Sequence, residues 1–210
     1  MPALLEALAA SGTPVSILTK GTLLRRDLPL LDRLSHEVPI DLAMSIAVFD
    51  DELQHAVEPG TPTTAARLAT VAAAREAGLP CGVFMMPVLP YLTDTVAHLD
   101  RALAAIKAAD ASFVLWSALH LKPGVKEWYL DWLARTHPQH LRTYRGMYAD
   151  GAYAPKAYRQ WLSARIRPLI ARHGLVVGRA DEGTGAVRSR AAGVVQPPPR
   201  PPSAVQPALF

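Results

Sequence analysis

The stretches that decide the fold are IDLAMSIAV (residues 40–48), TPTTAARLATVAAAREAG (residues 61–78) and CGVFMMPV (residues 81–88). The first and third are almost wholly apolar, as strands covered on both faces by crossover helices tend to be. In the middle stretch Thr61 is a good N-cap, Pro62 suits the first helical position and Gly78 ends the helix. A strand, a helix and a strand in this order predict two parallel strands of one sheet.

The same alternation extends in both directions along the chain. Further strands are predicted at 15–19 and 112–119, and helices at 2–10, 26–34 and about 94–109, the last capped by Thr93 or Asp94. We therefore expect an α/β fold, a partial (βα) barrel of the TIM type with about four parallel βα units over residues 1–125. Because a predicted helix precedes the first predicted strand, we expect the chain to begin midway through a βα series.

After Pro123-Gly124 the pattern changes to helices that carry aromatic residues, with Trp128 and Trp132 four residues apart. This predicts a basic, aromatic helical extension over 126–176, packed on the barrel. Residues 177–210 contain a polyproline-type run and are predicted to be a disordered tail. Its end, Gln206–Phe210, resembles peptides that dock on the bacterial sliding clamp, which makes the clamp a possible partner.

Composition narrows the classes of protein that the chain can represent. Half of the residues are apolar and 19% are charged, which suits a folded domain. No apolar run is long enough to cross a bilayer and no signal sequence opens the chain, so we expect a cytoplasmic protein without membrane contact. Cys81 is the single cysteine, so no intramolecular disulfide and no set of cysteine metal ligands can form in this chain, and we expect it to bind no metal.

The net charge of +4 is unevenly distributed. Residues 135–173 hold eight Lys/Arg and one acidic residue, whereas residues 1–134 hold ten Lys/Arg and 15 Asp/Glu. A basic block of this density attracts polyanions, although many such runs are solvated faces. The candidate residues for contacts with DNA or another nucleic acid are Arg142, Arg145, Lys156, Arg159 and Arg165.

Ligands of parallel α/β folds bind beyond the carboxyl ends of the strands, which directs attention to three places. Thr19-Lys20-Gly21 puts an ammonium group at the end of the first strand, where the alternative is a solvated lysine. Ser45 brings a hydroxyl group that binds a ligand or satisfies nearby backbone. Met85 and its neighbours form a soft apolar wall that suits a flat ring, or simply fill the core.

Several segments together resemble the radical S-adenosylmethionine proteins related to spore photoproduct lyase and the DNA repair photolyases. In the family's order and spacing these are Thr19-Lys20 with Leu24–Leu31, Ser45 before Phe49–Leu53, Glu58–Pro62, Ala77–Pro80, Met86–Pro90 with Leu92–Asp94, and Leu121–Lys126. The resemblance covers about residues 13–175. It implies a partial barrel that holds a [4Fe-4S] cluster and S-adenosylmethionine, whose cleavage gives a radical that abstracts hydrogen from a substrate.

Carried over by residue, Lys20 resembles the lysine that pairs with the cofactor carboxylate. Ser45 resembles the serine near the ribose or amino group, and the shelf around Phe84–Met86 resembles the wall that receives adenine. Thr19 and Met85 are counted with them as cofactor contacts. The catalytic residue itself is not identified by the resemblance.

The family's cluster loop, Cys-x-x-x-Cys-x-x-Cys, is absent from the chain. We therefore expect the C-terminal two-thirds or so of such a protein, inactive alone, with the loop supplied by an upstream segment or a separate chain. The first strand would then expose an unpaired edge. Two alternatives are a non-catalytic module that binds nucleic acid through the helices of 135–173, and a barrel enzyme that uses Lys20 as a Schiff-base nucleophile.

Overall fold

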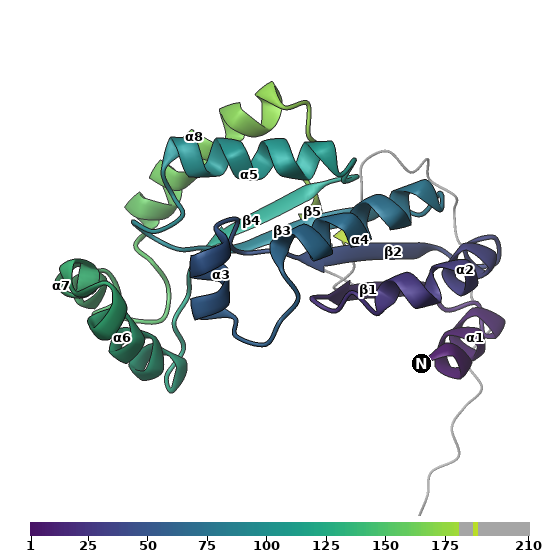
Figure 1. Ribbon diagram of the computed structural model, residues 1–210, viewed down its shortest axis with the longest axis horizontal. Helices are drawn as coiled ribbons and strands as arrows, with labels where there is room; N and C mark the ends of the chain where they lie inside the picture. The colour runs from purple at the N-terminus through teal and green to yellow at the C-terminus, as the bar shows by residue number, and fades with distance from the viewer. Residues whose placement is uncertain (181–186, 189–210) are drawn as a thin grey trace, which may run out of the picture.

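A computed structural model describes residues 1–180 and 187–188. Four parallel strands form one sheet in the order β1 (Val15–Thr19), β2 (Ile40–Ser45), β3 (Cys81–Val88) and β4 (Val114–Ala118) (Figure 1). Spatial order follows chain order, because each connection crosses over to the next position. The expected α/β class with four parallel βα units is confirmed, and β1 is an edge strand among the described residues.

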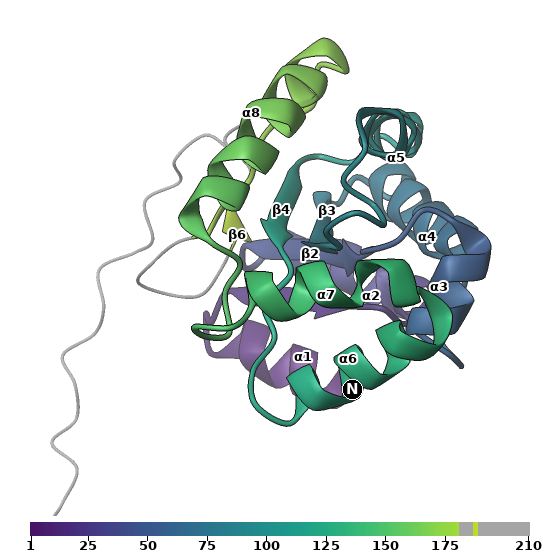
Figure 2. The same cartoon turned by 90° about the vertical axis from the view of Figure 1, so that its left-hand side faces the viewer.

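The helices fall into two groups. Those that pack along the sheet are α1 (Pro2–Ala10), α2 (Leu24–Ser35), α4 (Thr64–Glu76), α5 (Val96–Ala108) and α8 (Lys156–Arg172). Those near the carboxyl ends of the strands are α3 (Asp51–Val57), α6 (Val125–Thr136) and α7 (Pro138–Met147), and Figure 2 shows α6 and α7 in front of the sheet. The carboxyl edge of the sheet is therefore partly covered.

Helix α8 is a crossover helix and not an appended extension. Its apolar side belongs to the main core, and the chain then returns beside β4, where Val177 forms a parallel bridge with Val114. The amide of Val114 donates to the Val176 carbonyl at 2.9 Å, and the amide of Gly178 donates to the Val114 carbonyl at 3.1 Å. Residues 176–178 thus begin a fifth βα position.

The predicted boundary of the tail, at residue 177, falls within this returning segment. Residues 177–180 continue the fold, and β5 (Arg179–Ala180) pairs antiparallel with β6 (Val187–Arg188). The polyproline run and the clamp-like end Gln206–Phe210 lie outside the described residues. Within the described residues, no helix has the length and apolarity needed to cross a membrane.

Two helix caps differ from the prediction. Helix α4 begins after Thr63, whose hydroxyl accepts from the Ala66 amide, and not at Thr61. Thr61 is occupied elsewhere, because its hydroxyl donates to the Glu58 carbonyl. Helix α5 is capped by Thr95 through the His98 amide, one or two residues beyond the predicted cap. Both caps were assigned too early because several neighbouring residues have capping side chains.

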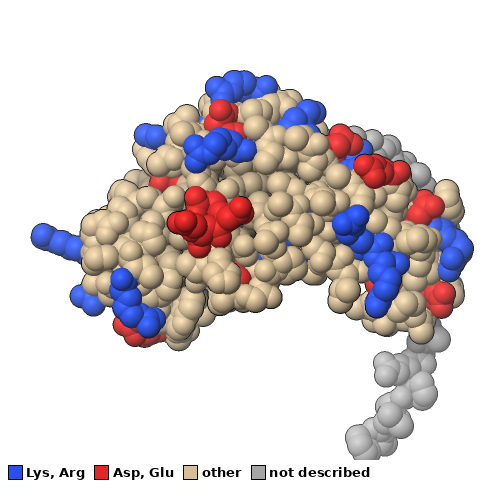
Figure 3. Space-filling model, in the orientation of Figure 1, with Lys and Arg blue, Asp and Glu red and all other residues tan. Residues whose placement is uncertain are grey.

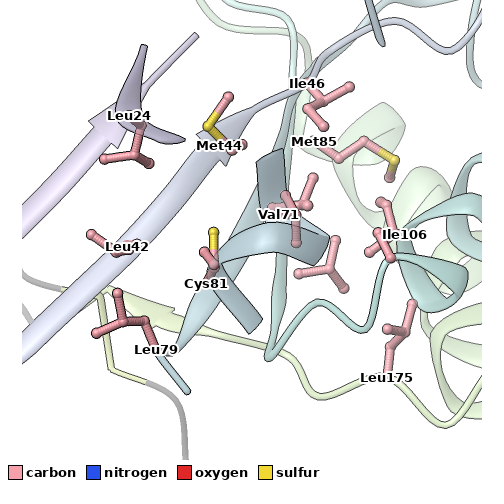
Figure 4. Close-up of a cluster of buried hydrophobic side chains, with 14 of the residues drawn as sticks. Leu24, Leu42, Met44, Ile46, Val71, Leu79, Cys81, Met85, Ile106 and Leu175 are labelled. Atoms are coloured by element: carbon pink, nitrogen blue, oxygen red, sulfur yellow. The ribbon is translucent and has the colours of Figure 1, made fainter. Parts of the chain in front are cut away.

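The main core lies between the sheet and the helices on one face. Figure 4 shows Leu42, Met44 and Met85 from the strands beside Val71 of α4 and Ile106 of α5. Side chains alternate along a strand, so their neighbours point to the opposite face. That face holds a smaller cluster of Ala43, Phe84 and Phe113, with Met86 and Leu115 against it. The helices that pack along the sheet thus lie on one face, as in the partial (βα) barrel that the sequence predicts.

A second apolar cluster joins α6 and α7 to the carboxyl ends of the strands. It includes Tyr144, whose hydroxyl donates to the Pro90 carbonyl at 2.6 Å, and Tyr148, whose hydroxyl donates to the Leu119 carbonyl at 2.8 Å. Burial raises the pKa of both tyrosines, so they remain donors. These bonds satisfy carbonyl groups that follow β3 and β4 and fix the two helices at this edge.

Close packing at Gly82 gives a test of the uncovered face. A Cβ atom at Gly82 would lie 2.2 Å from Cζ of Phe113, so the ring must move to admit a methyl group. We expect Gly82→Ala to destabilise the protein by about 1–3 kcal/mol in urea unfolding. The matched change Gly146→Ala, in α7 with no atom near the new methyl group, should be neutral or stabilise by up to about 1 kcal/mol. Equal stability of the two variants would contradict this packing.

Candidate functional site

The carboxyl edge of the sheet brings Lys20 and Ser45 together. In the parallel register Thr19 lies opposite Met44, so Lys20 and Ser45 occupy the next position on neighbouring strands. Ser45 alternates with Ala43 and therefore shares the face that the helices leave uncovered. Within the described residues, the Ser45 side chain makes no hydrogen bond and is partly exposed. The hydroxyl is thus available to a ligand.

The ammonium group of Lys20 is held by a carboxylate. Its Nζ atom lies 2.6 Å from Oε1 of Glu58, in the segment that joins α3 to α4. The Lys20 side chain is 47% exposed, whereas the Glu58 side chain is only 10% exposed. Glu58 is therefore the protected partner of this pair, and the Lys20 side chain remains accessible to solvent.

Arg67 of α4 holds the Glu58 carboxylate by a second charged interaction. Its Nη2 atom donates to Oε2 of Glu58 at 2.7 Å, and its Nη1 atom donates to the Ser45 carbonyl at 2.9 Å. Further bonds run to the Pro62 carbonyl at 2.8 Å and to the Thr61 hydroxyl at 2.6 Å. Arg67 is fully buried. One guanidinium group thus joins the end of β2, the segment after α3 and the start of α4.

Opposing effects set the protonation of Glu58. Desolvation by burial is the largest and favours the neutral acid, but hydrogen bonds and attraction from Lys20 and Arg67 together outweigh it. The pKa of Glu58 is consequently lowered from its ordinary value of 4.5. The residue is a carboxylate at neutral pH, and Lys20–Glu58 is an ion pair.

Sequence reasoning did not single out Arg67 or give Glu58 a role of its own. The signal was present, because an arginine interrupts the alanine-rich side of a helix that packs on the sheet. A charged residue at such a position must find partners inside the protein. The partners themselves come from 5 to 22 residues away, and only the fold brings them to the helix.

The other predicted cofactor contacts are placed differently. The Thr19 hydroxyl accepts from the Gly21 amide at 2.9 Å and so shapes the turn after β1. Met85 is 2% exposed in the main core on the helix side of the sheet, so the structure does not support its assignment as a cofactor contact. Phe84 and Met86 lie on the opposite face, and Phe84 pairs in register with Ser45. The apolar shelf is therefore formed by the neighbours of Met85.

Cys81 does not have the surroundings of a metal ligand. It lies at the amino end of β3, fully buried, and burial raises its pKa to about 12. Thiolates are the form that binds metal. The described part of the chain also contains no group of three His, Cys, Asp or Glu side chains that could hold a metal ion.

The basic residues proposed for nucleic acid lie on two helices. Arg142 and Arg145 belong to α7, and Lys156, Arg159 and Arg165 belong to α8. All five are exposed, and none has a carboxylate partner among the described residues. On the face shown in Figure 3, Lys and Arg side chains form separate spots at the upper, left and right sides of the molecule, and an acidic group lies over α3.

The stability of the protein should report on Glu58 as pH changes. Because its folded pKa is lowered, the contribution of Glu58 is fully present above pH 4.5 and disappears as pH falls through the lower folded value. We expect Glu58→Gln to cost about 1–3 kcal/mol of unfolding free energy at pH 7. The difference from wild type should shrink below pH 4.5.

Asp110→Asn provides the matched control for this experiment. Asp110 also pairs with an arginine, Arg75, but its side chain is 72% exposed. The control should cost less than about 1 kcal/mol, as exposed ion pairs do. A cost at Glu58 no larger than at Asp110, or one that does not change with pH, would contradict the buried network.

Comparison with known proteins finds similar sequences in mycobacteria and in a virus. An uncharacterized protein of Mycobacterium bovis is 53% identical to the chain over 175 residues, which are 83% of this chain and 52% of that protein. Uncharacterized proteins of two Mycobacterium tuberculosis strains match with the same values. One of Acidianus two-tailed virus is 33% identical over 87 residues, which are 41% of this chain and 28% of that protein.

The chain spans about half the length of the mycobacterial relatives. No solved structure matches it significantly. Residues 1–103, from α1 to the middle of α5, match the family model described as Radical SAM superfamily. This region, just under half of the chain, is therefore similar to that superfamily, and it contains Lys20, Ser45, Glu58 and Arg67.

Proposed function

We propose that this chain is the part of a radical S-adenosylmethionine enzyme that binds the methionine portion of the cofactor. The observation that carries the proposal is the Lys20–Glu58 ion pair beside the available hydroxyl of Ser45 at the carboxyl edge of the sheet. Ligands of parallel α/β folds bind at this edge. The family match over residues 1–103 supports the choice of cofactor.

The donor set fits a zwitterion. S-adenosylmethionine carries a carboxylate and an ammonium group on its methionine portion. The half-exposed ammonium of Lys20 would take the carboxylate in a charge-assisted interaction, and Glu58 with the Ser45 hydroxyl would take the ammonium group. The Lys20–Glu58 ion pair would thereby be exchanged for two ion pairs with the ligand, so every charged group keeps a partner.

The apolar residues beside Ser45 suit the other end of the ligand. Phe84 lies next to Ser45 in the register, and Met86 follows on the same face. An aromatic ring and a polarizable thioether form a wall on which adenine can pack. We assign this wall to the neighbours Phe84 and Met86, since Met85 points into the core.

The residues of this chain do not fit the iron–sulfur cluster that the family implies. Clusters of this kind are held by several cysteine thiolates, and the sequence contains Cys81 alone, buried at the amino end of β3. When present, such a cluster supplies the electron that cleaves the cofactor reductively. We propose that its ligands come from residues outside these 210 and that the chain is inactive alone in radical chemistry.

The ion pair also bears on the Schiff-base alternative. A lysine nucleophile must be free to attack its substrate, but Nζ of Lys20 lies 2.6 Å from a carboxylate oxygen of Glu58. The geometry therefore favours a lysine that binds anions over one that attacks carbonyl groups.

Calorimetric titration tests the cofactor site with two ligands that differ by one group. We expect Lys20→Ala to weaken binding of S-adenosylmethionine by at least about tenfold, because the ligand carboxylate no longer has a cationic partner. Binding of decarboxylated S-adenosylmethionine should be nearly unchanged by this substitution. The control Lys107→Ala, on the exposed side of α5, should bind both ligands like wild type. Equal reductions for both ligands, or no binding to the wild-type chain, would contradict the assignment.

As a second candidate we propose that α7 and α8 bind nucleic acid, as a substrate or a partner. The observation in favour is the exposure of Arg142, Arg145 and Arg159 without carboxylate partners among the described residues. Phosphate groups would provide those partners, and binding of this kind weakens steeply as salt displaces it.

Fluorescence anisotropy with a labelled single-stranded oligonucleotide tests this surface. We expect salt-sensitive binding, and we expect Arg142→Gln with Arg145→Gln to reduce the salt slope by about one for each arginine that pairs with a phosphate. The matched pair Arg26→Gln with Arg33→Gln lies on α2, where both arginines already face carboxylates, and should retain the wild-type slope. Binding that does not respond to salt, or equal effects of both pairs, would refute the assignment.

A further inference from the structure

A cavity of about 360 Å³ lies between α8 and the segment that follows β3. Its walls are Tyr91 and Asp94 on one side and Ala157, Tyr158 and Trp161 on the other. The proposed cofactor site assigns no role to it, because the lining of the cavity includes neither Lys20 nor Ser45. Its volume falls in the range of sites for small molecules.

The polar group of this cavity is a buried carboxylate. Asp94 is only 4% exposed, and Tyr158 donates its hydroxyl to Oδ2 of Asp94 at 2.8 Å. Within the described residues, Asp94 forms no ion pair and accepts no other hydrogen bond. Buried carboxylates are normally paired with a cation or fully hydrogen-bonded. One oxygen of Asp94 is therefore left for a ligand.

Nearby groups do not supply the missing charge. His98 lies one turn into α5, and burial, followed by repulsion from Arg101, lowers its pKa. The ring is thus neutral near pH 7 and does not pair with Asp94. The Tyr158 hydroxyl offers a neutral hydrogen bond, which compensates a buried charge only in part.

The remaining walls of the cavity are aromatic. Tyr91 is 48% exposed and stacks against His140 at 5.6 Å between ring centroids. Tyr158 stacks against Trp161 at 5.4 Å. Trp161 already attracts a cation, because the Arg165 guanidinium lies 4.0 Å from its ring centroid. The faces of such rings are electron-rich and attract positive charge.

We propose that this cavity binds an alkylammonium ion. The cation would approach Asp94 and be enclosed by the rings of Tyr91, Tyr158 and Trp161, an arrangement in which charge pairing and cation–π attraction act together. Anionic ligands are disfavoured because Asp94 would face them without an intervening cation. Uncharged ligands would leave the carboxylate unpaired.

The proposal does not depend on the cofactor site, and its test uses the full chain without iron or S-adenosylmethionine. Calorimetric titration with choline is compared with titration of its uncharged isostere, 3,3-dimethyl-1-butanol. We expect choline to bind at least about tenfold more tightly, because the two ligands share a shape and differ in charge. Equal affinities, or no choline binding to the folded wild-type chain, would overturn the proposal.

Variants locate the binding. Asp94→Asn should reduce the affinity for choline at least about tenfold and abolish the preference over the isostere. Trp161→Ala changes a residue that is 39% exposed, so it tests the wall even if Asp94→Asn does not fold. It should weaken choline binding several-fold, whereas Trp128→Ala, at an exposed tryptophan on α6, should not. Wild-type choline binding by folded Trp161→Ala would overturn the assigned site.

Discussion

The guanidinium group of Arg67 is removed from solvent, and each of its hydrogen bonds must therefore be made inside the protein. The oxygens that it finds belong to Ser45, Glu58, Thr61 and Pro62. Those residues lie in the end of β2 and in the segment between α3 and α4. Removal of this one side chain would take a donor from Oε2 of Glu58 and from the carbonyl groups of Ser45 and Pro62, a large penalty in the protein interior.

The same constraint positions the proposed cofactor site. Arg67 holds Oε2 of Glu58, and this leaves Oε1 directed at Lys20. It also holds the carbonyl group of Ser45, which fixes the backbone from which the hydroxyl projects. A rigid support behind exposed polar groups reduces the conformational entropy that the protein loses when a ligand binds. The buried arginine thus prepares a lysine and a serine that themselves remain accessible.

The carboxyl edge of the sheet is organised by a second set of buried polar bonds. Tyr144 and Tyr148 of the α6–α7 region reach the carbonyl groups of Pro90 and Leu119. They close the region beyond β3 and β4, while the region beyond β1 and β2 stays accessible at Lys20. Because Pro90 directly precedes Tyr91, the same contacts support the segment that forms one wall of the aromatic cavity.

Local patterns in the sequence were sufficient for the parallel strands and their helices. Apolar runs such as 40–48 and the alanine-rich stretch before Gly78 encode strand and helix directly, because burial and propensity act over a few residues. The position of Lys20 at a strand end followed from the same patterns, whereas the apolar run 40–48 places Ser45 inside the predicted strand. The sequence determined the lengths of the strands less well. Strand β2 ends at Ser45 because its pairing with β3 ends there.

What the tertiary structure decided depends on contacts between distant residues. The sequence separates Glu58 from Lys20 by 38 residues, and their ion pair exists only because the sheet and α4 bring them together. The alternation of side chains along β3 places Met86 on the same face as Phe84, whereas Met85 points into the main core. The role of α8 was hidden for a similar reason. Its helical pattern is local, but its place as a crossover helix depends on Val176–Gly178 returning to β4, more than 60 residues away in the chain.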